Sequence, residues 1–143
     1  MKKIICLLVV ALMVASVAFA AAKVKMTAKD LPGLKGTWQG ILGFGVTEQG
    51  GTSPAILEIL SDTVPVKAKF TVTNVPDIVA QRTGLQGGQN VFEGEGVITT
   101  QGTLMFIGPQ KNFVEVGLIS KEKINVRYIY QSLSGDGDFK KKK

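Results

Sequence analysis

Apolar and polar side chains alternate strictly over residues 64–73. The apolar positions are Val64, Val66, Ala68, Phe70 and Val72. Lys67 and Lys69 fall between them, so one face of the segment would be buried and the other would face water. Period two over this length is typical of a half-buried antiparallel strand. The segment therefore predicts a strand, with Pro65 near its start, where a missing backbone donor is tolerated.

Shorter segments with similar alternation follow along the rest of the chain, separated by Gly, Pro, Asn and Asp. We predict strands over residues 36–44, 55–60, 64–73, 91–99, 103–107, 113–119, 123–132 and 139–142. The 143 residues suffice for one domain and not for two. The sequence therefore predicts an all-β fold, an antiparallel up-and-down barrel of about eight short strands, with a two-sheet sandwich as the alternative.

The connections carry turn-forming residues. Residues 49–54 are predicted to be a loop, and Gly135-Asp136-Gly137 a tight turn. Residues 75–90 lack alternation, and we expect a short helix there, with Asn74 as its cap and Gly84 near its end. Long loops in compact domains are often functional. This segment is therefore either a lid over the barrel mouth or a simple crossing connection.

The first twenty residues have the pattern of a cleaved signal peptide. Lys2 and Lys3 precede an apolar run that ends in Ala18-Phe19-Ala20, a small-x-small cleavage site. A second site lies two residues later, and a retained membrane anchor is the rival interpretation. We therefore expect a signal peptide over 1–20, a leader over 21–35 and a barrel domain over 36–143, in a periplasmic or extracellular protein.

The composition excludes several classes of chemistry. The chain has no histidine and one cysteine, Cys6, so it has no His-based catalytic relay, no thiolate zinc site and no intrachain disulfide. Asp136 and Asp138 are too few for a calcium loop. Glu93 and Glu95 alternate on the face of a strand that we expect to meet water. We therefore expect a non-catalytic protein with no metal and no cofactor.

The positive charge lies mainly at the C-terminus. The whole chain carries 17 basic and 11 acidic residues, and loss of Lys2 and Lys3 leaves 15 basic residues. Lys140, Lys141, Lys142 and Lys143 account for the remaining excess, so the body is neutral and a nucleic-acid partner is not expected. The four lysines would make at most a peripheral membrane contact. The alternative is a frayed, solvated end that keeps the protein soluble.

The first predicted strand contains Gly36-Thr37-Trp38. This G-x-W resembles the opening motif of lipocalin-like (calycin-type) barrels, and the end of the chain is similar to that of small bacterial exported lipocalin-like proteins. The resemblance implies that Trp38 closes one end of the barrel and that a basic residue of a late strand lies across it. Here Arg127 is the residue expected in that structural role, through a cation–π contact.

Four aromatic residues are expected on the inward faces of the strands: Phe70, Phe92, Tyr128 and Tyr130. In an open barrel they would line a pocket, with the tyrosine hydroxyls as its polar groups. In a filled barrel they would form the core, and the sequence does not decide between these cases. We expect a small hydrophobic ligand of the lipid or fatty-acid class. The alternative is a structural or interaction subunit of an envelope or extracellular assembly, and the oligomeric state stays open.

Overall fold

The computed structural model describes residues 22–45, 51–109, 111–131 and 133–143. The predicted signal peptide lies outside these residues. The helical elements are η1 (Ala28–Asp30), α2 (Leu31–Leu34) and α3 (Asp77–Thr83). The strands are β1 (Gly36–Phe44), β2 (Gly51–Ile59), β3 (Val66–Val72), β4 (Asn90–Ile98), β5 (Leu104–Ile107), β6 (Phe113–Ser120), β7 (Lys123–Tyr130) and β8 (Leu133–Lys141). Over the described residues, no helix is long and apolar enough to cross a bilayer.

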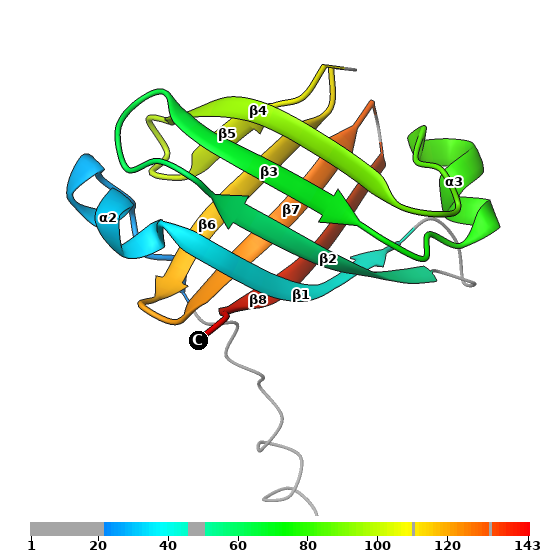
Figure 1. Ribbon diagram of the computed structural model, residues 1–143, viewed down its shortest axis with the longest axis horizontal. Coiled ribbons are helices and arrows are strands. Elements are labelled where there is room, and N and C mark those ends of the chain that lie inside the picture. The colour runs from blue at the N-terminus through cyan, green and yellow to red at the C-terminus, as the bar shows by residue number, and fades with distance from the viewer. Residues whose placement is uncertain (1–21, 46–50, 110, 132) are drawn as a thin grey trace, which may run out of the picture.

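The eight strands form one closed antiparallel barrel in sequence order, with α2 and α3 at opposite ends (Figure 1). Each strand pairs with the next along the chain, and β8 returns to pair with β1, so that Gly40 lies opposite Phe139. The predicted up-and-down barrel is confirmed, and the sandwich is excluded. Closure leaves no free sheet edge, which explains how short strands can form one stable sheet.

The inner face of β3 follows the alternation seen in the sequence. Val66, Ala68, Phe70 and Val72 are buried, whereas Lys67 is exposed. Burial of one face fixes the register, because a slip by one residue would turn every apolar side chain outward. Most of the other predicted strands end within two residues of the observed ones. Two strands begin earlier than predicted: β2 begins at Gly51, which pairs with Phe44, and β8 begins at Leu133. Residues 51–54 of the predicted loop therefore belong to β2, and residues 49 and 50 lie outside the described residues.

The predicted turn at Gly135-Asp136-Gly137 is wrong, because all three residues lie within β8. Gly135 and Gly137 instead allow the barrel to close. A Cβ atom at Gly137 would collide with the backbone oxygen of Ile41, and one at Gly135 would collide with the ring of Phe44. Glycine therefore allows β8 to approach β1 closely enough to close the barrel.

The leader closes the first end of the barrel. Met26, Leu31 and Leu34 are buried in the core, although the sequence suggested only a polar segment here. Asp30 accepts hydrogen bonds from the backbone N–H and hydroxyl of Thr27, a capping box that starts η1. These bonds hold the pKa of the Asp30 carboxyl below its ordinary value. The leader therefore closes this end of the barrel, and we call its residues 26–34 the plug.

At the other end, α3 lies across the barrel mouth (Figure 1). Val79 is fully buried, and Leu85 is buried just beyond the helix. Gly84 ends the helix in the left-handed conformation, with φ of 69°. The expected cap is wrong: Pro76 occupies the N-cap position, and Asn74 lies outside the helix with φ of 51°.

Candidate ligand site at the α3 end of the barrel

Tyr128 is the centre of an aromatic cluster inside the barrel. Its ring stacks on Phe70 at 6.4 Å between centroids, meets Phe92 at 6.0 Å and meets Phe44 edge-on at 6.5 Å. Such offset and edge-on pairs each stabilise by about 0.5–1.5 kcal/mol beyond simple burial. The cluster fills the half of the barrel that lies beneath α3.

The Tyr128 hydroxyl joins this cluster to α3. It donates to the backbone carbonyl of Thr83 at 3.4 Å, and the Thr83 hydroxyl in turn donates to the Val79 carbonyl at 2.7 Å. Burial raises the pKa of Tyr128 to about 12, and the nearby Asn112 amide opposes part of that rise. Tyr128 therefore carries a neutral hydroxyl that ties the aromatic cluster to α3.

Asn112 places an unpaired amide inside the barrel. The residue is 1% exposed, and among the described residues neither its Oδ1 nor its Nδ2 has a hydrogen-bond partner within 3.5 Å, although the amide is near enough to the Tyr128 hydroxyl to lower its pKa. Its side chain lies directly against the Cα of Gly108, where no Cβ would fit, and its backbone carbonyl accepts from the Gly108 N–H at 2.8 Å. A buried polar group without a partner costs about 1–3 kcal/mol, so it calls for a bound water or ligand.

Asn112 is one of the residues that line a small cavity of about 20 Å³. Its walls include Phe70, Phe92, Phe106 and Val114. A space of about 10–15 Å³ on this measure holds one water, whereas pockets for drug-sized ligands are roughly 300–1,000 Å³. This cavity therefore has room for about one water, which favours the filled-core alternative over an open pocket among the described residues.

The cavity reaches the barrel wall where β4 extends beyond β5. The β4–β5 ladder pairs only Glu95–Ile98 of β4 with the four residues of β5. The cavity lining accordingly includes wall residues Gly94, Ile107 and Gly108 as well as inward side chains. Phe92 is only partly buried at this position. Phe92 is therefore a partly exposed aromatic side chain in the cavity lining.

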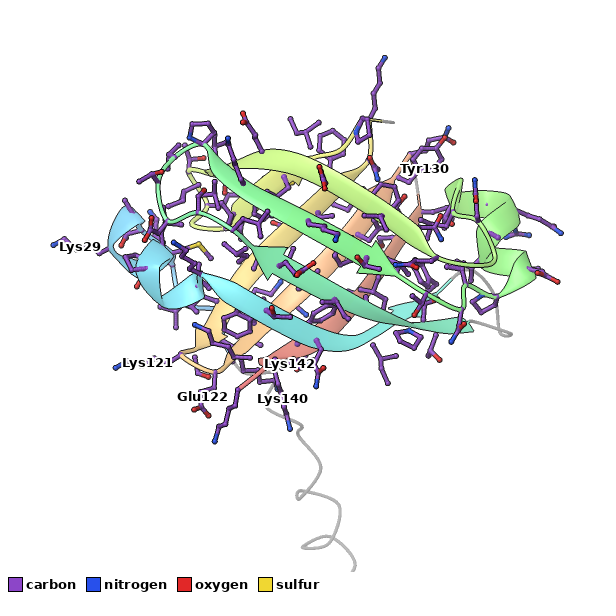
Figure 2. All side chains as sticks on the ribbon, in the orientation of Figure 1. Lys29, Lys121, Glu122, Tyr130, Lys140 and Lys142 are labelled. Carbon is purple, nitrogen blue, oxygen red and sulfur yellow. The ribbon has the colours of Figure 1, made fainter. Side chains whose placement is uncertain are left out.

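Three of the four residues predicted to line a pocket come together here. Phe70, Phe92 and Tyr128 contact one another in the aromatic cluster, as described above. Tyr130 is half-buried at the rim, where its ring lies against Gly84 beside α3 (Figure 2). Sequence reasoning missed Asn112, because it stands in a turn next to Gly108-Pro109 and nothing in the alternation indicates that a turn residue points inward.

The contact expected between Trp38 and Arg127 is wrong. Lys141 lies over the Trp38 ring, with its Nζ 5.3 Å from the ring centroid, whereas Arg127 is exposed on β7. The reason is strand order: Trp38 on β1 pairs directly with Lys141 on β8, and β7 is one strand further away. Trp38 itself is fully buried, and its Nε1–H donates to the Leu34 carbonyl at 2.7 Å.

The carboxylates considered in the sequence analysis face outward. Glu93 and Glu95 are exposed, as predicted. Asp138 pairs with Lys123 at 2.7 Å, and this hydrogen bond holds the Asp138 pKa below its ordinary value. In the part of the chain that the structure describes, no three Asp, Glu or Cys side chains gather as metal ligands.

The C-terminal lysines are not a frayed end. β8 runs through Lys141, and the Lys142 N–H donates to the Thr37 carbonyl at 2.8 Å. The Lys141 ammonium also donates to the Gly33 carbonyl of α2 at 2.6 Å. These bonds fix the last strand against the plug and hold the lysines at one end of the barrel.

No protein-family model matches the chain, and no curated protein matches it either. Among solved structures, the chain is similar to a redesigned β-barrel, with a TM-score of 0.58 and 17% sequence identity. The match covers 82% of this chain and 99% of the other. At that identity the likeness supports the barrel fold alone.

Proposed function

We propose that this chain is an exported, non-catalytic β-barrel that binds a compact hydrophobic molecule carrying one hydrogen-bonding group. The observation that carries the proposal is the buried, unpaired amide of Asn112 in a cavity walled by aromatic rings. Its lining, apolar with one or two polar groups, has the composition of a small-molecule site, although the cavity would have to enlarge to hold more than a water. Export to the periplasm or outside the cell is supported by the signal-like pattern of residues 1–20.

The ligand's polar group would hydrogen-bond the Asn112 amide. Its apolar part would displace the partly buried Phe92 ring from the cavity lining. An apolar cavity of about 150 Å³ suffices for a benzene-sized molecule. An acyl chain is too long for the filled interior. We therefore propose a compact hydrophobic ligand in place of the lipid or fatty acid expected from the sequence.

We also propose that the barrel is lipocalin-like in the construction of its closed end. Gly36-Thr37-Trp38 lies on the first strand, and a cation from the last strand covers the tryptophan ring. This arrangement supports the proposal with Lys141 in place of Arg127. The proposed likeness concerns how the barrel is stabilised, and it gives Trp38 no role in ligand binding.

The test measures, by titration calorimetry, the binding of indole, a compact neutral aromatic molecule with one N–H donor, to the wild type and to Asn112→Leu. Leu has nearly the shape of Asn, so the variant should stay folded. It lacks the polar group that would bond the ligand, so it should bind at least tenfold more weakly, which corresponds to the loss of one buried hydrogen bond. Asn125→Leu is the matched control, because Asn125 bonds Gly137 and Asp138 on the outer side of β7 and β8. Equal binding by all three proteins would overturn the proposal.

A second candidate function is the structural or interaction subunit. It is favoured by the filled interior and by an apolar hollow on the outer faces of β1 and β2, where Ile41 is 59% exposed and Ile56 is 40% exposed. A stable oligomer without any bound small molecule would support this candidate instead.

A further inference from the structure

The lysines of the leader, the β6–β7 turn and the C-terminus meet at one end of the barrel, which we call the basic end. Two adjoining surface hollows, of about 570 and 630 Å³, share Ser120 and Lys141. The lysines that line them are Lys29, Lys121, Lys123, Lys140, Lys141, Lys142 and Lys143. Figure 2 shows Lys121, Lys140 and Lys142 on the side of the molecule away from Tyr130 and α3.

The positive charge of the basic end is only partly compensated. Among the hollows' lining residues the acidic ones are Asp30 and Glu122. The Asp30 oxygen accepts from Thr27, and nearby Asp138 is paired with Lys123. Because residues 21–139 carry equal numbers of basic and acidic residues, this local excess marks one surface rather than the whole protein.

The chemistry of the basic end fits a diffuse anionic surface. Its cations are lysines, which act as flexible, hydrated point charges, whereas a built phosphate or carboxylate site typically uses the two-pronged geometry of arginine. Both arginines of the chain lie elsewhere, on α3 and on β7. The hollows also contain apolar Val24, which is 52% exposed, and no aromatic side chain on which a base could stack.

We propose that the basic end docks the barrel on an anionic lipid bilayer. Each lysine near such a surface is attracted to the anionic headgroups. Val24 lies among these lysines, where it would meet the headgroup region. In this orientation α3 and the cavity at the opposite end face away from the membrane. The inference is independent of the proposed ligand, because the two involve opposite ends of the barrel.

The experiment is flotation of the exported protein with vesicles of phosphatidylcholine alone or of phosphatidylcholine mixed with phosphatidylglycerol. We expect binding only to the anionic vesicles, and we expect added salt to weaken it. The test variant combines Lys121→Gln, Lys140→Gln and Lys142→Gln, which leaves Lys141 on Trp38. Each lysine near an anionic surface is worth a factor of about five, so the triple variant should bind on the order of 100-fold more weakly.

The control variant combines Lys67→Gln, Lys111→Gln and Arg127→Gln, which removes the same charge from other surfaces. It should bind the vesicles nearly as well as the wild type. Equal losses in both variants would show a net-charge effect and overturn a localised surface. If the protein does not bind the vesicles, the bilayer is not its partner. This holds whether or not the protein is retained on an anionic polysaccharide or DNA. Circular dichroism confirms that each variant is folded.

Discussion

Lys141 covers the face of Trp38, with its ammonium 5.3 Å from the ring centroid and bonded to the Gly33 carbonyl at 2.6 Å. The last strand, the first strand and the plug helix α2 therefore meet at one contact. A cation over an aromatic face contributes about 0.5–1 kcal/mol where it is partly exposed. This contact fastens the end of the chain to its beginning and thereby helps to close the barrel.

Replacing Lys141 with Gln should lower the free energy of unfolding by about 1 kcal/mol, since both the cation–π contact and the bond to Gly33 are lost. Arg127→Gln is the control, because an exposed side chain away from special contacts usually changes stability by less than about 0.5 kcal/mol. Urea denaturation measures both. A larger loss in Arg127→Gln would restore the partner that the sequence suggested.

Trp38→Ala should cost about 3–5 kcal/mol, because it opens a large cavity at the plug. Trp38→Phe should cost less, because it keeps most of the packing and loses the hydrogen bond from Nε1 to Leu34. The measurement is the midpoint of chemical unfolding. An unchanged midpoint for Trp38→Ala would contradict the burial of this side chain.

Gly137→Ala should destabilise the barrel by about 2–3 kcal/mol, because the new Cβ would collide with the Ile41 backbone oxygen at the β1–β8 closure. Gly33→Ala is the matched control. A Cβ there meets nothing within 4 Å, and Ala favours the helix over Gly by about 1 kcal/mol. If Gly137→Ala were tolerated as well as Gly33→Ala, the predicted tight turn at 135–137 would be the better description.

The stability of the protein should fall between about pH 10 and pH 12. The pKa of Tyr128 is raised to about 12 in the folded state, whereas the ordinary value is 10.0. The unfolded chain therefore loses its proton first as pH rises, and the stabilisation from the neutral hydroxyl disappears through this range. Two pKa units correspond to about 3 kcal/mol. Tyr128→Phe should remove most of this pH dependence in denaturation measurements, and an unchanged dependence would contradict the assignment.

Alternation was sufficient to predict the barrel, because burial of one face leaves a local pattern such as that of Val66–Val72. The position of Lys141 over Trp38 depends on which strands are neighbours after closure, and no local pattern records that. The leader was misjudged for a similar reason: Met26, Leu31 and Leu34 are spaced among polar residues and become a core only against the barrel. Asn112 points inward from a turn, and hydrophobic alternation does not predict which way the side chain of a turn residue faces.

A small ligand bound at the α3 end of the barrel would travel with the purified protein. The most direct test is native mass spectrometry of the exported protein, purified from its own cells without detergent. We predict a reproducible extra mass of a small molecule that disappears on denaturation and is absent from Asn112→Leu. A clean mass of the polypeptide alone in the wild type would contradict the claim, and an oligomer in that same spectrum would favour the interaction subunit.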